Sequence, residues 1–64
     1  MISSLVVECA ADAVDAVAAA LAEQAGVEVH ERKGYKLVVT IEADTVDASS
    51  DTAGSFVGIP GVLG

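Results

Sequence analysis

The stretch "VEVHERKGYKLVVTIEA" (residues 27–43) decides the fold, because it has the pattern of a β-hairpin. On the first arm, Val27 and Val29 alternate with polar residues, which is the period of a strand with one buried face. Gly34 provides a residue that can take a positive φ in the turn. The second arm, residues 36–43, alternates again. The stretch therefore predicts two antiparallel strands that share one apolar face.

The segment before the hairpin, "DAVDAVAAALAEQAG" (12–26), predicts a helix. Asp12 is a suitable N-cap, and Asp15 suits the positive end of the helix dipole. Gly26 is placed to end the helix in a left-handed conformation. The apolar residues that recur at helical spacing and form one narrow face are Val14, Val17, Ala18 and Leu21.

The segment after the hairpin, "DTVDASSDTAGSFVG" (44–58), predicts a second helix that is short or frayed. Asp44 and Asp47 repeat the arrangement of a cap followed by an acid in the first turn. Several residues in the middle are poor helix formers, namely Ser49, Ser50 and Gly54. The residues spaced for an apolar face are Val46, Ala53 and either Phe56 or Val57.

The two ends of the chain complete the predicted order of elements. Residues 2–9, "ISSLVVEC", are a β-rich run, and Pro60 ends the second helix so that Val62 and Leu63 begin another strand. The order is β-α-β-β-α-β, a ferredoxin-like split βαβ arrangement of the α+β class, with an antiparallel sheet and two helices on one face. We expect one domain over residues 1–64 and the usual strand order 4-1-3-2. So short a fourth strand is predicted to be truncated, leaving an uncovered sheet edge for self-association.

Alternation divides the strand residues between two faces of the sheet. We expect the helices to cover Leu5, Val7, Val27, Val29, Leu37, Val39 and Ile41. The opposite face would display Ser4, Val6, Glu8, Glu28, His30, Lys36, Val38, Thr40 and Glu42. On adjacent strands of this open face, Val6 and Val38 would form a small apolar patch with carboxylates at its margins. The pattern by itself fits either an ordinary half-solvated sheet face or a binding face.

Composition restricts the function. Ten acidic residues against three basic ones give a net charge of −7, so clustered phosphates of nucleic acid and anionic membrane surfaces would be repelled. A cationic peptide is the complementary partner. No run reaches the roughly 18 apolar residues that a membrane span requires, and the N-terminus lacks the basic region of an export signal. The chain has a single cysteine, Cys9, which is typical of proteins in a reducing compartment. We therefore expect a cytoplasmic protein without stable membrane insertion.

Neither catalysis nor metal binding is predicted. The serine hydroxyls have only His30 as a conceivable base, and no third group is placed by spacing. Cys9 and His30 are two candidate metal ligands, whereas a metal site needs several that converge. We expect a binding protein that has no cofactor and is not an enzyme.

Four segments in this order and spacing resemble the NapD family, the cytoplasmic chaperones for assembly of periplasmic nitrate reductase. They are "SSLVVE" (3–8), "GVEVHE" (26–31), "GYKLVVTIEA" (34–43) and "IPGVLG" (59–64). The resemblance implies a ferredoxin-like fold that binds the twin-arginine signal peptide of the catalytic nitrate reductase subunit. Binding would delay export by the Tat system until the molybdenum cofactor is inserted. The family normally continues into a full fourth strand, and its second helix is richer in large apolar residues.

The implied peptide-binding residues lie on the open face: Ser4, Val6, Glu8, Glu28, His30, Val38, Thr40 and Glu42. The alternative is a small regulatory or ligand-binding domain of the ACT type, which shares the fold and also needs no catalytic residues. Stabilisation by an amino acid would favour this alternative, and stabilisation by a twin-arginine peptide would favour the chaperone.

Overall fold

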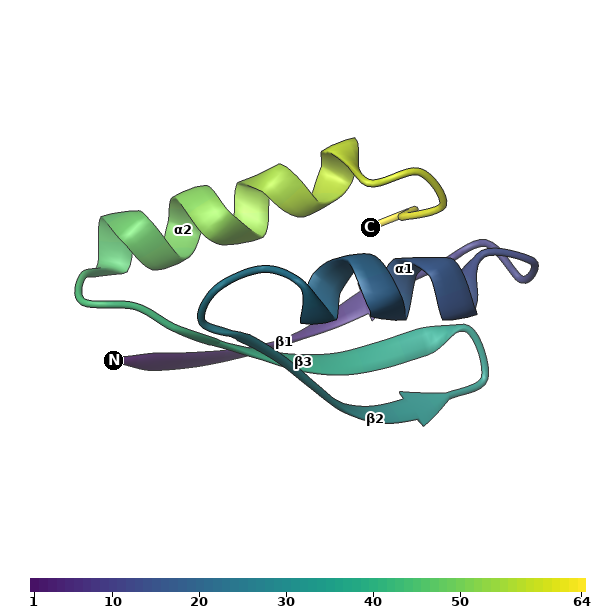
Figure 1. Cartoon of the computed structure of the whole chain (residues 1–64), viewed down its shortest axis with the longest axis horizontal. Coiled ribbons are helices and arrows are strands. Elements are labelled where there is room, and N and C mark those ends of the chain that lie inside the picture. Colours follow the sequence, from purple (N-terminus) through teal and green to yellow (C-terminus); the bar gives the residue numbers. More distant parts are fainter.

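The computed structural model describes residues 1–64 and has the predicted order of elements as far as the second helix (Figure 1). The α+β class is confirmed. The elements are β1 (Ile2–Glu8), α1 (Val14–Ala22), β2 (Val27–Lys33), β3 (Lys36–Glu42), α2 (Val46–Ser55) and a 3₁₀ helix (Phe56–Gly58).

The three strands form one antiparallel sheet in the order β1-β3-β2, with β3 in the centre. In the β1–β3 pairing, Leu5 lies opposite Val39 and Val6 lies opposite Val38. The hairpin turns at Gly34, whose φ is 61°, as predicted. The β1-β3-β2 order matches part of the expected order 4-1-3-2, and the fourth strand stays a prediction.

The end of the chain runs beside only one end of β1. Cys9 and Val62 form an isolated antiparallel bridge. The backbone N–H of Glu8 donates to the carbonyl of Gly64, and the N–H of Leu63 donates to the carbonyl of Glu8, each at 2.8 Å. Ahead of Glu8, β1 has no strand on this side. Self-association through that edge therefore stays a prediction.

Both helices lie on the same side of the sheet (Figure 1). The predicted inward-facing residues are confirmed: five of the seven are buried, and Leu5 and Val29 are partly buried against them. Ten apolar residues form the buried core. Helix α1 contributes Val14, Val17 and Leu21, and the 3₁₀ helix contributes Phe56. One face of the sheet therefore packs against the helices to form the core, and no helix covers the other face.

The first helix begins later than the sequence predicts. Asp12 is not its N-cap: Ala13 holds that position, and no side chain caps the helix. The reason is a turn before the helix, closed by a hydrogen bond from the N–H of Ala13 to the carbonyl of Ala10 at 3.0 Å. Asp15 does lie in the first turn. The helix ends at Ala22, so Gly26, with a φ of 78°, lies in the following turn and not directly at the helix end.

The second helix has ten residues, one more than α1, so it is not the shorter of the two. Its cap is Thr45 and not Asp44, because the Thr45 hydroxyl accepts a hydrogen bond from the N–H of Ala48 at 3.0 Å. Of the residues spaced for an apolar face, Val46 is exposed and Ala53 is partly buried; of the two alternatives Phe56 and Val57, Phe56 is the buried one. Ser49 is also buried, and its hydroxyl donates to the hydroxyl of Ser3 at 2.9 Å. Ser49 therefore occupies a buried position of α2 at which helical apolar spacing alone would favour a larger, apolar side chain.

Candidate functional site

The face of the sheet that carries no helix displays the predicted peptide-binding residues. Pairing of Ser4 with Thr40, Val6 with Val38 and Glu28 with Thr40 places their side chains on this face. Most of them are exposed, and Val38 and Thr40 on the central strand are half-buried. The full set is Ser4, Val6, Glu8, Glu28, His30, Val38, Thr40 and Glu42; we call this surface the open face.

An apolar patch lies in the middle of the open face. Val6 on β1 is directly opposite Val38 on β3, and 53% of Val6 is exposed. Ile2, opposite Glu42 at the end of the same strand, is 70% exposed. Ile2 was not among the predicted site residues. The alternation of β1 does place it on this face, since it is an even-numbered position like Val6.

A β-bulge interrupts the pairing of β2 with β3 at His30. Val29 lies opposite Val39, whereas Glu31 lies opposite Val38, so His30 is one extra residue on β2. A bulge of this kind bends the strand and re-aims side chains. The His30 Nε2 atom is 2.6 Å from the Thr40 Oγ1 atom and 3.6 Å from a carboxylate oxygen of Glu28. His30, Thr40 and Glu28 are therefore one connected polar group on the open face.

The bulge also changes which residues face each way after it. Glu31, opposite Val38, joins the open face, and Arg32, opposite Leu37, moves to the helix side. Strict alternation predicts that Glu31 shares the helix-covered face with Val29. The sequence analysis therefore does not include Glu31 among the residues of the open face. The signal in the sequence was the charge itself, because a carboxylate is a poor neighbour for a buried valine face.

On the helix side, the Arg32 guanidinium donates a hydrogen bond to the carboxylate of Asp15. Asp15 lies in the first turn of α1, so this pair links β2 to the helix layer. The pair also holds Arg32, the one arginine of the chain, on the helix side and away from the open face.

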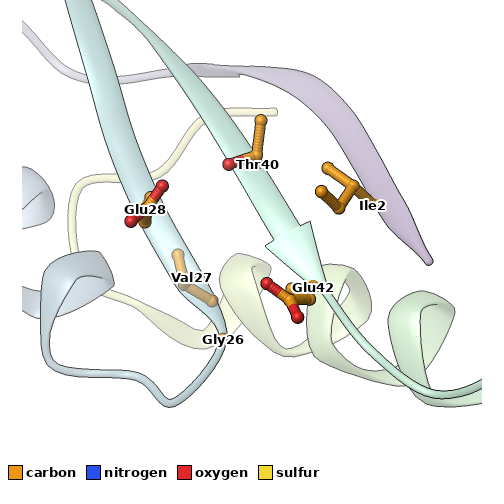
Figure 2. Close-up of a pocket in the computed structure, with 6 residues that line it drawn as sticks. All are labelled: Ile2, Gly26, Val27, Glu28, Thr40 and Glu42. Carbon is orange, nitrogen blue, oxygen red and sulfur yellow. The ribbon is translucent and has the colours of Figure 1, made fainter.

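A hollow of about 310 Å³ lies at the end of the open face where β1 and β2 begin and β3 ends. Figure 2 shows Glu28, Thr40, Glu42 and Ile2 on three different strands around it. Gly26 and Val27 complete the lining. The hollow thus presents two carboxylates, one hydroxyl and the apolar side chain of Ile2.

Cys9 is buried at 3% exposure and is a free thiol. Burial raises the pKa of this thiol, and the positive charge of Arg32 opposes that shift. No group of three or more His, Cys, Asp or Glu side chains is arranged to hold a metal ion. None of the helices has the length and apolar character that crossing a membrane requires.

The comparison with protein families decides the family. The family model of the NapD protein matches residues 1–64. The chain belongs to the NapD family. The resemblance found in the four sequence segments is therefore confirmed.

A solved NapD structure has the same fold. The chain is similar to the solution structure of the E. coli Tat proofreading chaperone protein NapD, with a TM-score of 0.93 and 26% identity over 100% of this chain and 70% of that one. No curated protein matches the sequence significantly. NapD is a family of chaperones and not of enzymes, in agreement with the sequence analysis.

Proposed function

We propose that this NapD-family protein is a cytoplasmic chaperone that binds the twin-arginine signal peptide of the periplasmic nitrate reductase catalytic subunit. Binding delays Tat export until the molybdenum cofactor of that subunit is inserted. Family membership over residues 1–64 and the likeness to a Tat proofreading chaperone support the proposal.

The observation that carries the binding mode is the pairing of Val6 with Val38 on a face that no helix covers. A twin-arginine signal peptide has an arginine pair followed by an apolar run. As an amphipathic helix, it lays that run on the valine patch while its arginines meet carboxylates at the margin. The predicted residues Ser4, Glu8, Glu28, His30, Thr40 and Glu42 surround the patch and form the polar rim.

Magnitudes separate the roles of the two kinds of contact. Exposed ion pairs contribute about 0.2–1 kcal/mol each. Burial of about 400 Å² of apolar surface contributes about 10 kcal/mol gross, at about 25 cal/mol per Å², and association and peptide ordering offset a large share of this. Apolar contact therefore sets the affinity, and the carboxylates orient the peptide and select for positive charge.

Isothermal titration with a synthetic twin-arginine signal peptide tests the proposal. The unchanged protein should bind, and Val38→Glu should abolish or strongly weaken binding because it places a carboxylate in the apolar contact. Val46→Glu is the matched control: Val46 is 63% exposed at the start of α2, in the helix layer. Equal loss in both variants, or no binding by the unchanged protein, contradicts the proposal.

Thermal unfolding with added peptide or added amino acids separates the chaperone from the ligand-sensing alternative. A melting temperature that rises with the peptide and not with free amino acids supports the chaperone. The delay of export is tested in cells that lack the protein, where the exported nitrate reductase should contain less molybdenum cofactor.

A further inference from the structure

The charges of the open face are distributed unevenly along the strands. At the end where β3 finishes, Glu28 and Glu42 carry negative charge. At the opposite end, Lys36 lies across from Glu8 on one side and from Lys33 on the other. One end of the face is therefore acidic and the other end carries both lysines.

The acidic end holds little positive charge of its own. The amino-terminal ammonium of Met1 donates to the carbonyl of Ala43 at 2.8 Å. His30 contacts the Glu28 carboxylate at 3.6 Å. No lysine or arginine forms an ion pair with Glu28 or Glu42. These carboxylates are free to accept hydrogen bonds from an incoming cation.

The acidic end is also the part of the face that is hollowed. Gly26 lies so close to β3 that a Cβ atom there would be 2.5 Å from the Glu42 carbonyl oxygen. The turn therefore lines the hollow without filling it with a side chain. Ile2 forms an apolar wall, and Thr40 adds a hydroxyl beside the two carboxylates (Figure 2).

This lining fits an arginine side chain. A guanidinium presents five donors in a planar fork, which suits two carboxylates and a hydroxyl around it. The methylene stem of arginine packs on apolar surface while its charged end is hydrogen-bonded. The hollow, at about 310 Å³, is at the small end of the about 300–1,000 Å³ of ligand pockets, which suits one side chain rather than a whole ligand.

We propose that the hollow between Glu28 and Glu42 receives an arginine of the twin-arginine pair and so fixes the direction of the bound peptide. This inference rests on the proposed function and specifies which carboxylates of the open face contact the arginine. The arginine end lies over Glu28, Thr40 and Glu42, and the apolar run extends over Val6 and Val38 toward the Lys33–Lys36 end. Glu8 contributes less, because it lies directly opposite Lys36.

Titration with two peptides tests the arginine site. One peptide carries the arginine pair, and the other carries uncharged citrulline at both positions. The double variant Glu28→Gln/Glu42→Gln should bind the arginine peptide about 3- to 10-fold more weakly than the unchanged protein, as expected for exposed ion pairs. It should bind the citrulline peptide with unchanged affinity. The double variant Glu23→Gln/Asp51→Asn, which also removes two exposed carboxylates but in the helix layer, is the charge-matched control and should change neither affinity.

The possible failures are distinguishable. If the unchanged protein binds the arginine peptide but the double variant binds it equally well, the arginine site is wrong and the proposed function stands. An equal loss for both peptides also overturns the arginine site. If the unchanged protein binds neither peptide, the proposed function fails.

A spin label on the amino terminus of the arginine peptide tests the direction. The label should broaden the backbone amide signals of Gly26 and Thr40 more than those of Gly34 and Tyr35, at the far end of the hairpin. Stronger broadening of Gly34 and Tyr35 overturns the proposed direction.

Discussion

Arg32 on β2 donates a hydrogen bond to Asp15 in the first turn of α1. The contact exists because the extra residue His30 turns Arg32 toward the helix side. Without the bulge, strict alternation would place Arg32 on the open face, where its positive charge would compete with a cationic peptide for the carboxylates. The bulge therefore serves both the stability of the helix layer and the charge of the open face.

The Arg32–Asp15 pair should be weakly coupled. The two side chains are 53% and 90% exposed, respectively, and exposed pairs contribute about 0.2–1 kcal/mol. A double-mutant cycle with Arg32→Ala and Asp15→Ala, followed by urea unfolding, should give a coupling in this range. The coupling should shrink in 1 M salt, because the charges are then screened. Strictly additive losses would show that the contact contributes nothing.

Gly26→Ala should destabilise the protein much more than Gly34→Ala. Both glycines have positive φ, which costs a residue with a Cβ atom about 1–2 kcal/mol. Only at Gly26 does the new Cβ also meet backbone, 2.5 Å from the Glu42 carbonyl oxygen, whereas the space around Gly34 is open. Thermal unfolding of the two variants measures the difference. Equal melting temperatures would contradict the close approach of the turn to β3.

The partly buried hydrogen bond between Ser49 and Ser3 predicts a non-additive result. Ser49→Ala alone should lower the free energy of unfolding by about 1 kcal/mol, because it removes the donor for Ser3 in a partly buried contact. Ser3→Ala/Ser49→Ala should cost less than the sum of the two single changes, since neither hydroxyl is then left unpaired. Chemical denaturation of the three variants provides the comparison, and a simple sum would argue against the hydrogen bond.

Cys9 should make stability fall at alkaline pH. Burial raises the pKa of its thiol, so the folded protein holds this proton more tightly than the unfolded chain, whose thiol titrates near about 8.5. The contribution is complete below the unfolded pKa and is lost as pH rises above it through the folded pKa. The free energy of unfolding should therefore fall more between pH 7 and about pH 9.5 in the unchanged protein than in Cys9→Ala. Parallel pH profiles would refute this role of the thiol.

The valine patch should matter more for peptide affinity than Glu8. Val6→Glu should weaken binding of the signal peptide by about tenfold or more, a loss of at least about 1.4 kcal/mol. Glu8→Gln should cost less than about fivefold, since one exposed pair contributes at most about 1 kcal/mol. Calorimetric titration of both variants gives the ranking. A larger loss for Glu8→Gln would mean that charge, and not apolar contact, sets the affinity.

The faces of the sheet could be predicted from the sequence because alternation is a local property. Val7, Leu37 and Val39 are buried, and Val6 is exposed, as their positions in the strands require. Family-specific runs such as "KLVVTIEA" added the chaperone class, which composition and periodicity could not have supplied.

The parts that could not be predicted depend on contacts between distant segments. The bulge at His30 is set by pairing with β3, and it moved Glu31 and Arg32 to faces that alternation does not assign. Ser49 is buried because Ser3 lies beneath it, although valine spacing favoured Val46. The hollow is formed by three strands and a turn, so no single run of sequence shows it.

The central claim is that the uncovered side of the sheet contacts the peptide, and isotope-filtered nuclear Overhauser spectroscopy of the complex tests it most directly. The account predicts that apolar side chains of the twin-arginine peptide show Overhauser contacts to the methyl groups of Val6 and Val38. Contacts to the methyl groups of Val46 and Val57, which are exposed in the helix layer, with none to Val6 and Val38, would contradict it.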